Sequence, residues 1–553
     1  MMSNTTFFEK SKEIANDFIQ SIVFLDDKAY RNSDNENTAH DFDALKISKI
    51  FAKENKICAV YRPESEKDIE DFKSIADKAD CVILDWQIDI KQEILKGSEE
   101  DDAPYDDYRG LYTKEIIKSI LFDEGQQKDS LKIIIIYTGD YTLLEDISTS
   151  IYSDVFSSSS EYTLNLKDCS IQSSHVKVIV RAKEVKIAAA SNREKYENFM
   201  INYESLPSFI LDEFTHMTSG LLSNFALMSL TTLRKNSSKI LGLFSKEMDS
   251  AYLSHKALLP SQEDAEDLLI DLFGDTIADL LLYNKINEEI RGLIQGWIDL
   301  IIKIEHKNEV FKKKGKADNI TVNYIRNHAL LVDLVSSKNK DVGKRYIDAF
   351  SKNAGLSKTK AEEYYDYISN NNITTQLFLN NSEMGSQQGI DQRFSILTHH
   401  KSLFIPSNTI HKLTLGTVVK STVVSDKYYI CIQQRCDSVR IQQNTDRKFL
   451  FIPLKISDGK FDIITPEGVR LKKVNDSFSI RTIKFVCTND YGVIVAEKDD
   501  KGKPVFTQKY TDEQFEWILD LKDLHAQRII IDYTTKLSRV GLDESEWHRK
   551  YLS

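Results

Sequence analysis

The stretch from Ala79 to Asp89 constrains the fold more than any other part of this 553-residue chain. Its residues Cys81 to Leu84 form a short, unbroken apolar run that leads directly into Asp85. Such a run predicts a β-strand that is buried on both faces, as the strands of parallel sheets are. The functional groups of such sheets lie at the carboxyl ends of the strands, so we expect Asp85 to lie where chemistry takes place.

Three other apolar runs also end in polar side chains. Ser21–Tyr30 closes on Asp26 and Asp27, Leu131–Asp140 closes on Thr138, and Val176–Glu184 closes on Lys183. A further strand is expected at Ile57–Tyr61, and segments with helical spacing separate the five strands. This alternation predicts an α/β domain with a doubly wound, five-stranded parallel sheet.

Each of these strand ends is ordinary when it is taken alone. Two consecutive aspartates often open a turn after a strand, and a Thr-Gly-Asp sequence after a strand is equally common. The order of the four is more specific, because it offers a pair of acids, a single acid, a hydroxyl and an amine at the same edge of one sheet.

This order over residues 1–192 resembles the receiver domain of bacterial response regulators, which has a flavodoxin-like fold. The resemblance implies that Asp85 accepts a phosphoryl group, that Thr138 and Lys183 hold the phosphoryl oxygens, and that a sensor histidine kinase or a phosphotransfer protein is the partner. It also implies a Mg²⁺ cofactor, held by Asp26, Asp27, Asp85 and the backbone carbonyl of Gln87.

Two departures leave alternatives open. The gaps from Asp85 to Thr138 and from Thr138 to Lys183 are longer than receivers usually have, so Arg181 competes with Lys183 as the cation of the site. Phosphatases of the haloacid dehalogenase type also use a strand-end Asp with Mg²⁺, Thr and Lys. They need an Asp-x-Asp pattern on the first strand, whereas this chain has Asp26-Asp27-Lys28.

Composition excludes several other classes of protein. The net charge is −12 and no large basic domain is present, so nucleic acid is not an expected partner. The six cysteines are scattered, which indicates neither a disulfide framework nor a zinc ribbon. No apolar run is long enough for a membrane span, and the first residues lack the apolar region of a signal peptide. We therefore expect a cytoplasmic protein.

Beyond residue 192 the pattern changes twice. Residues 193–405 have helical spacing, and residues 406–510 contain short runs rich in β-branched and aromatic residues that predict a β-rich domain. Residues 511–553 are predicted to close the chain as a helical segment. Ser153–Ser174 is predicted to be irregular, and the basic stretch Phe311–Asn319 an exposed loop, with a phosphate- or nucleic-acid-binding patch as the alternative.

Two loops are expected beside the proposed site, a polar one at Arg31–His40 and an acidic one within Lys91–Gly110. The acidic loop is either a solvated connection or a lid or partner-docking element.

The long receiver followed by helical and β-rich parts is similar to the receiver proteins of bacterial antiphage two-component systems of the Detocs type. Two functions follow from these patterns. In one, phosphorylation of Asp85 receives a signal or drains phosphate, with an effector protein as a further possible partner. In the other, the receiver is a phosphate-independent docking module and the chain is an interaction adaptor. Beyond self-phosphorylation and autodephosphorylation of the receiver, no enzyme activity is expected.

Overall fold

The computed structural model describes residues 6–30, 42–90, 110–123, 126–127, 130–184, 195–259, 264–303, 310–312, 319–321, 325–326, 331–336, 338–371, 375–379, 387–401, 409–474, 479–509, 511 and 513–537. The chain groups into two compact units. Unit 1 comprises residues 1–305 and 323–365, and unit 2 comprises residues 306–322 and 366–553. The division into four parts at residues 192, 405 and 510 stays a prediction.

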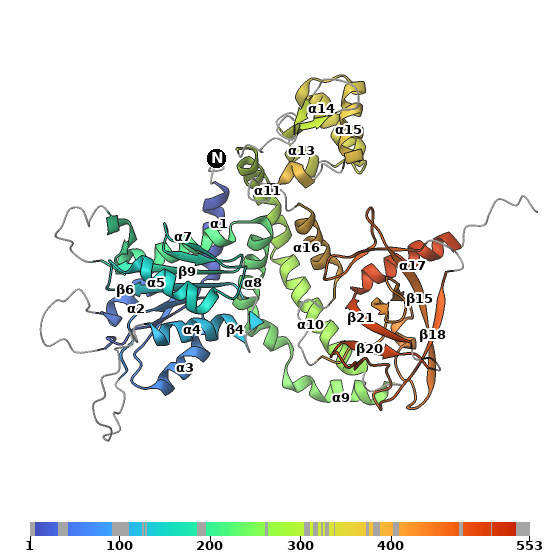
Figure 1. Ribbon diagram of the computed structural model, residues 1–553, viewed down its shortest axis with the longest axis horizontal. Coiled ribbons are helices and arrows are strands. Elements are labelled where there is room, and N and C mark those ends of the chain that lie inside the picture. Colours follow the sequence, from blue (N-terminus) through green and yellow to red (C-terminus); the bar gives the residue numbers. More distant parts are fainter. Residues whose placement is uncertain are drawn as a thin grey trace, which may run out of the picture. The chain divides into compact units, whose positions relative to one another are not determined.

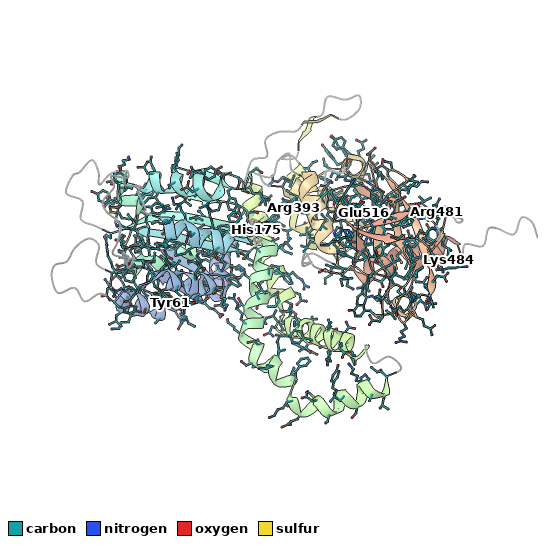
Figure 2. All side chains as sticks on the ribbon, turned by 60° about the horizontal axis from the view of Figure 1, so that its bottom comes forward. Tyr61, His175, Arg393, Arg481, Lys484 and Glu516 are labelled. Carbon is teal, nitrogen blue, oxygen red and sulfur yellow. The ribbon has the colours of Figure 1, made fainter. Side chains whose placement is uncertain are left out.

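Unit 1 contains the predicted parallel sheet (Figure 1). The strand order β2-β1-β3-β6-β9 is that of a doubly wound sheet, and each neighbouring pair in it is parallel. The edge strand β2 ends at Tyr61, which Figure 2 labels. The five strands are β1 (Ser21–Leu25), β2 (Ile57–Tyr61), β3 (Cys81–Leu84), β6 (Lys132–Thr138) and β9 (Val176–Lys183).

The central strands are buried on both faces, which is why they are unbroken apolar runs. All four residues of β3 and all seven of β6 are buried. Burying one Ile, Val or Leu side chain contributes about 1.5–3 kcal/mol relative to leaving it exposed. The predicted α/β class is therefore confirmed, together with the placement of the five strands.

Helices cover both faces of this sheet. Apolar residues of α3, α4 and α5 pack on one face, whereas those of α1, α2 and α7 pack on the other. Capping boxes begin two of these helices, with Thr6 and Glu9 at α1 and Ser65 and Asp68 at α3. The helices are α1 (Phe7–Phe18), α2 (Ala44–Lys53), α3 (Glu66–Ala76), α4 (Leu111–Leu121), α5 (Leu144–Ile151) and α7 (Leu206–Thr218).

The sheet is larger than the predicted five strands. Strands β7 (Thr163–Asn165) and β8 (Ser170–Gln172) form a hairpin that pairs antiparallel with β9. The short strand β10 (Met200–Ile201) pairs parallel with the end of β9, so that Ile201 is the register partner of Lys183. The prediction of an irregular segment at Ser153–Ser174 is therefore wrong in part, because that segment contains a π-helical turn (Tyr152–Phe156) and this hairpin.

Helices make up most of the remainder of unit 1. Helix α1 packs against α7, α8 and α11, helix α8 also packs on α11, and α10 packs on both α8 and α11. The bounds are α8 (Leu221–Leu243), α9 (Asp249–Leu258), α10 (Asp264–Tyr283), α11 (Ile286–Lys303), α13 (Leu331–Ser336), α14 (Val342–Ala354) and α15 (Lys358–Asn371), which runs on into unit 2. Among the helices that the structure describes, none is long and apolar enough to cross a bilayer.

Unit 2 is built around an antiparallel sheet of nine strands. Its path runs β16-β17-β15-β14-β13-β21-β20-β19, and β18 also pairs with β15. Along β18, Ile483 and Phe485 are buried, and Lys484 lies between them on the opposite face (Figure 2). The strands are β13 (Thr417–Ser421), β14 (Tyr428–Cys431), β15 (Asp446–Ile456), β16 (Ile463–Ile464), β17 (Arg470–Lys473), β18 (Arg481–Val486), β19 (Glu497–Lys498), β20 (Pro504–Thr507) and β21 (Gln514–Asp520).

Two helices accompany this sheet, α16 (Gln387–His399) and α17 (Asp523–Leu537). Ala526, Ile529 and Tyr533 of α17 pack into the apolar core of the sheet. The predicted β-rich domain with a terminal helix is thus confirmed as a fold class.

The helical pattern predicted from residue 511 is wrong at its beginning. Residues Gln514–Asp520 form β21, which pairs with both β13 and β20, and α17 begins only at Asp523. Phe515 and Leu519, spaced by four, fit a helix and a strand equally well, and both are buried in the sheet. The segment is a strand because its backbone pairs with β13 on one side and with β20 on the other.

The basic stretch Phe311–Asn319 lies mostly outside the described residues. At its ends, β11 (Val310–Lys312) and β12 (Asn319–Thr321) pair antiparallel. Two other short strands, β4 (Phe122–Asp123) and β5 (Gln126–Gln127), pair in unit 1.

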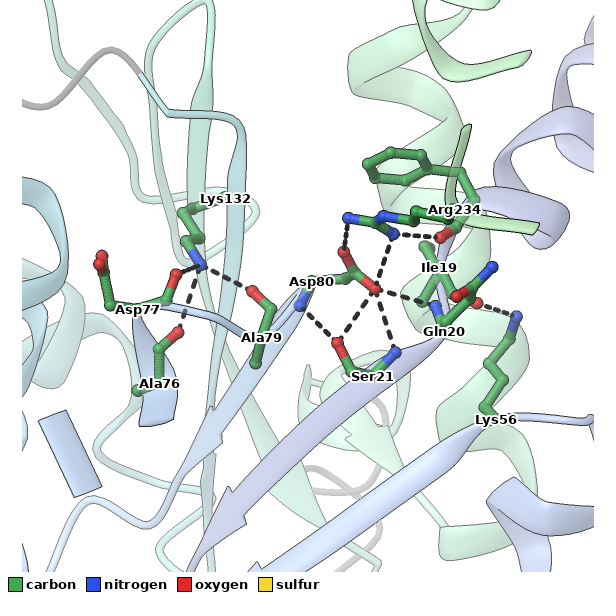
Figure 3. A network of polar contacts seen from close by, with 11 residues as sticks. Ile19, Gln20, Ser21, Lys56, Ala76, Asp77, Ala79, Asp80, Lys132 and Arg234 are labelled. Carbon is green, nitrogen blue, oxygen red and sulfur yellow. Dashed lines mark hydrogen bonds and ion pairs between the residues drawn. The ribbon is translucent and has the colours of Figure 1, made fainter. Parts of the chain in front are cut away.

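Buried polar side chains tie together the amino-terminal edge of the parallel sheet, which is the edge opposite Asp85 (Figure 3). The Oδ2 atom of Asp80 accepts hydrogen bonds from the backbone N–H groups of Gln20 and Ser21 at 3.0 and 3.1 Å. The Arg234 guanidinium of α8 lies 2.8 Å from Asp80 Oδ1. The Lys132 ammonium donates to the carbonyl oxygens of Ala76, Asp77 and Ala79. Helix α8 is therefore anchored directly to the parallel sheet.

Candidate functional site

Three carboxylates meet at the carboxyl edge of the parallel sheet. Asp26 and Asp27 follow β1, and Asp85 follows β3. Because β1 and β3 are parallel neighbours with Leu25 opposite Leu84, both strands end at the same level. One carboxylate oxygen from each acid lies within 4.8 Å of the other two. The exposed fractions of Asp26, Asp27 and Asp85 are 0%, 2% and 5%, so the cluster is buried.

Backbone groups orient two of these carboxylates. Asp26 Oδ1 accepts a hydrogen bond from the N–H of Lys28 at 2.8 Å, and Asp85 Oδ1 accepts one from the N–H of Trp86 at 2.8 Å. The Asp85 N–H donates in turn to the Leu25 carbonyl at 2.9 Å, which joins the two strand ends. The Oδ2 atoms of Asp26 and Asp85 are therefore left to contact the cation of the site.

That cation is Lys183, the last residue of β9. Its Nζ atom lies 2.7 Å from Asp26 Oδ2 and 3.5 Å from Asp85 Oδ2. The rings of Phe42 and Tyr137 flank the ammonium, with centroids at 5.5 and 5.9 Å. These contacts hold a charged group in a buried place.

Arg181, the competing candidate, points to a different partner. Its guanidinium donates to Asp168 Oδ1 and to the Asp168 carbonyl, both at 2.8 Å, and lies over the rings of Phe199 and Phe209. The structure therefore brings Lys183 rather than Arg181 to the carboxylates.

Burial dominates the electrostatics of the cluster. It raises the pKa of Asp85 to about 7; the Lys183 ammonium opposes this rise, while Asp26 and Asp27 add to it as like charges. Burial alone would lower the pKa of Lys183, but the carboxylates of Asp85 and Asp26 outweigh it and raise that pKa above its ordinary value. Lys183 thus stays cationic, and a single ammonium faces three acids.

This donor set fits a divalent metal ion. Carboxylate oxygens are the ligands that Mg²⁺ prefers, and it usually binds through one or two of them together with water. A dication would also balance the negative charge that Lys183 leaves uncompensated. Among the described residues, Asp26, Asp27 and Asp85 are the one group of acids, histidines or cysteines close enough together to hold a metal.

Two other predicted site residues belong to this edge of the sheet, Thr138 at the end of β6 and Gln87 three residues after β3. Thr138 ends β6 and is buried; Ile136 of the same strand is the register partner of Leu84, which places Thr138 at the site edge. Its hydroxyl accepts a hydrogen bond from the Asp140 N–H at 3.2 Å. Gln87 is exposed, and its side-chain amide donates to Asp89.

Two residues that support the site were not predicted. The Thr113 hydroxyl of α4 is fully buried and donates to the Asp85 carbonyl at 2.8 Å and to the Trp86 carbonyl at 3.2 Å. Gly110 is the N-cap residue of α4, has a φ of 78° and packs against the Trp86 ring so closely that a Cβ atom would overlap the ring. A hydroxyl residue on the apolar face of a segment with helical spacing was the available signal for Thr113.

The two loops predicted beside the site lie outside the described residues. These are the polar loop Arg31–His40 and all but the last residue, Gly110, of the acidic stretch Lys91–Gly110.

Comparison with known proteins supports a receiver domain in this part of the chain. Residues 18–188 match the family model described as response receiver domain. A comparison with curated proteins and another with solved structures each found no match. The matched residues contain all three acids, Thr138 and Lys183, and they suggest a signal receiver of the phosphorelay type.

Proposed function

We propose that this protein accepts a phosphoryl group on Asp85 from the phosphohistidine of a sensor kinase or a phosphotransfer protein. The observation that carries the proposal is the meeting of Asp85 with Asp26, Asp27 and Lys183 at one edge of a parallel sheet. The receiver-family match over residues 18–188 supports the same reaction.

In the proposed transfer, an oxygen of the Asp85 carboxylate attacks phosphorus in line with the departing imidazole nitrogen. A P–O bond forms as the P–N bond breaks, and the imidazole leaves with its electron pair and takes up a proton. The attacking oxygen must be deprotonated. The Lys183 ammonium favours that state, whereas burial and the neighbouring acids oppose it.

The residues that would hold Mg²⁺ are Asp26, Asp27 and Asp85, together with the carbonyl of Gln87. When bound, Mg²⁺ supplies positive charge next to the phosphoryl oxygens. Lys183 would supply further positive charge to these oxygens, and its contact with Asp26 keeps it at the site edge. Thr138 would donate its hydroxyl to one of the oxygens.

Phosphorylation would have one of two consequences. It would either change the remainder of the chain, as a received signal does, or remove phosphate from a partner. The anchoring of α8 to the sheet through Arg234 and Asp80 gives the domain a direct mechanical link to the helices that follow it. We propose that the chain is divided into four parts for this function: the receiver at 1–192, a helical connector at 193–405, a β-rich part at 406–510 and a closing segment at 511–553.

A role in antiphage defence also remains a proposal, and the architecture of a receiver followed by helical and β-rich parts supports it. The test is a plaque assay on cells that carry the gene together with its neighbouring genes. Protection that is lost with Asp85→Asn supports the role, and equal plaque numbers with and without the genes contradict it.

Phosphorylation itself is tested on the whole protein with acetyl phosphate and Mg²⁺. We expect Mg²⁺-dependent incorporation of one phosphoryl group, seen as a mobility shift on a phosphate-affinity gel. Asp85→Asn should abolish the shift, and the matched control Asp89→Asn, an exposed acid four residues further on, should retain it. Incorporation that persists in Asp85→Asn would contradict the proposal. Partner binding that is unchanged by Asp85→Asn would favour the adaptor function.

A further inference from the structure

Unit 2 contains a cavity of about 560 Å³ between the end of α16 and the beginning of α17. Its walls come from residues 398–401 on one side and residues 522–528 on the other. Two backbone hydrogen bonds hold the walls together, from the Lys522 N–H to the His399 carbonyl and from the Lys401 N–H to the Asp520 carbonyl, both at 2.8 Å. The cavity is therefore part of the folded unit.

The charges around this cavity are predominantly positive. Lys401, Lys522 and Arg528 line it, and within the described part of the chain none of the three forms an ion pair. The one acid in the lining, Asp523, is paired with Arg435 at 2.7 Å. Three cations thus line the cavity, against the paired carboxylate of Asp523 and the buried carboxylate of Asp520, whose charge acts on Lys401.

One of these cations is held in place by the protein. The Lys522 ammonium donates a hydrogen bond to the Leu397 carbonyl at 2.7 Å, in the last turn of α16. Lys522 also directly precedes α17, a helix of 15 residues, so the positive end of that helix faces the same space.

Two imidazole rings form a flat wall of the cavity. The rings of His399 and His525 stack with centroids 3.7 Å apart and an interplanar angle of 15°. His525 Nε2 lies 3.0 Å from the Asp462 carbonyl, so this nitrogen must carry the hydrogen. The Nδ1 atom of His399 is buried and has no hydrogen-bond partner among the described residues. This nitrogen has almost no accessible surface, so the wall that the two rings offer to the cavity is formed by their other ring atoms.

We propose that this cavity binds a small ligand that carries a phosphate group. An Arg guanidinium, two ammonium groups and a helix N-terminus give the lining several hydrogen-bond donors and positive charge, which a phosphate dianion matches better than a singly charged carboxylate. The proposal is independent of phosphorylation at Asp85, because the two sites lie in different units.

The test is a calorimetric titration of the whole protein with inorganic phosphate. EDTA is present, so that metal-dependent binding at Asp85 does not contribute. We expect saturable binding that Arg528→Gln and Lys401→Gln each weaken at least about tenfold, because each removes a charge-assisted hydrogen bond. Both side chains are exposed, so that neither substitution should prevent folding.

The control is Lys427→Gln, which removes an exposed lysine of the same unit away from the cavity. It should bind phosphate as the unchanged protein does, and so should Asp85→Asn. Acetate at equal ionic strength should bind far more weakly. Non-saturable binding, a loss in Arg528→Gln no larger than in Lys427→Gln, or acetate binding as tight as phosphate binding would each overturn the proposal.

Discussion

The Nζ atom of Lys183 lies 2.7 Å from Oδ2 of Asp26, although 157 positions separate the two residues in the chain. Lys183 ends strand β9 and Asp26 follows strand β1, and these two strands are not neighbours in the sheet, because β3 and β6 lie between them. This one contact therefore depends on the order of four strands, and on a shared edge at which they end.

Replacing Lys183 should reveal how strongly this contact stabilises unit 1. Lys183→Met leaves the carboxylates of Asp26 and Asp85 buried without their cation, and we expect the free energy of unfolding to fall by about 3–5 kcal/mol in EDTA. Mg²⁺ should restore part of the loss, because it binds the folded state. Urea denaturation of the whole protein, with and without Mg²⁺, measures both effects.

The control for this experiment is Lys46→Met, which removes an exposed ion pair with Glu204. Its unfolding curve should overlay that of the unchanged protein under both conditions. A Lys183→Met protein that is as stable as this control would show that the three acids do not need the ammonium.

Trp86 should report metal binding through its fluorescence. Its ring is buried beside Asp85, packs on Gly110 and lies 5.8 Å from the Lys114 ammonium. We predict a saturable change in tryptophan emission on addition of Mg²⁺, with an affinity that Asp26→Asn weakens at least about tenfold because one ligand is lost.

Two tryptophan variants assign the signal. Trp86→Phe should abolish the Mg²⁺ response, whereas Trp297→Phe, which changes a tryptophan of α11, should keep it. A response that survives in Trp86→Phe would mean that the metal binds elsewhere.

Asp80 and Arg234 form an ion pair whose two members should differ in importance. Asp80→Ala leaves the partly buried N–H groups of Gln20 and Ser21 without their acceptor, so we predict a loss of about 3 kcal/mol in the free energy of unfolding. The Arg234 side chain is 40% exposed, and Arg234→Ala should cost about 1 kcal/mol or less. Equal losses in denaturant unfolding would contradict this assignment.

The stability of unit 2 should fall in mild acid because of His399. Burial lowers the pKa of His399 to about 4, with His525 and Arg528 adding to the effect. The unfolded chain, in which the pKa is about 6.5, then binds more protons than the folded chain between these two values. Stability is therefore present above pH ~6.5 and is lost as the pH falls towards 4.

The measurement is the melting temperature of the whole protein across this pH range, compared with His399→Gln. The variant should show a shallower decline, while His255→Gln, which changes an exposed histidine of α9, should follow the unchanged protein. A decline as steep in His399→Gln would assign the acid sensitivity to other groups, such as His400 and His525, whose pKa values burial also lowers.

Much of the arrangement at the site edge could be predicted from the sequence. The hydrophobic pattern locates the buried strands, and the first charged residue after each run marks the strand end. An apolar run buried on both faces ends at its first charged residue, so the sequence alone assigns Asp26, Asp85 and Lys183 to one edge of the sheet. The sequence alone could not decide whether Lys183 or Arg181 supplies the cation of the site. The two side chains lie on the same face of β9, and the contact of Arg181 with Asp168 depends on the hairpin β7–β8.

The remaining differences arise where tertiary pairing overrides local pattern. The two-residue strand β10 is too short to have a period, and it exists because Met200 and Ile201 pair with the end of β9. In Gln514–Asp520, apolar residues spaced by four suited a helix, but partners on both sides made a strand. Thr113 supports the site from a helix face, through a hydrogen bond that no linear pattern encodes.

The addition of β10 to β9 has a practical consequence for anyone who wishes to work with an excised receiver. The family match stops at residue 188, yet Ile201, Leu206, Ile210 and Phe214 complete the apolar layer on one side of the sheet. A fragment limited to the matched residues would expose this apolar surface to water and would be expected to aggregate. The smallest autonomous piece must therefore begin before Phe7 and reach past Thr218, the end of α7.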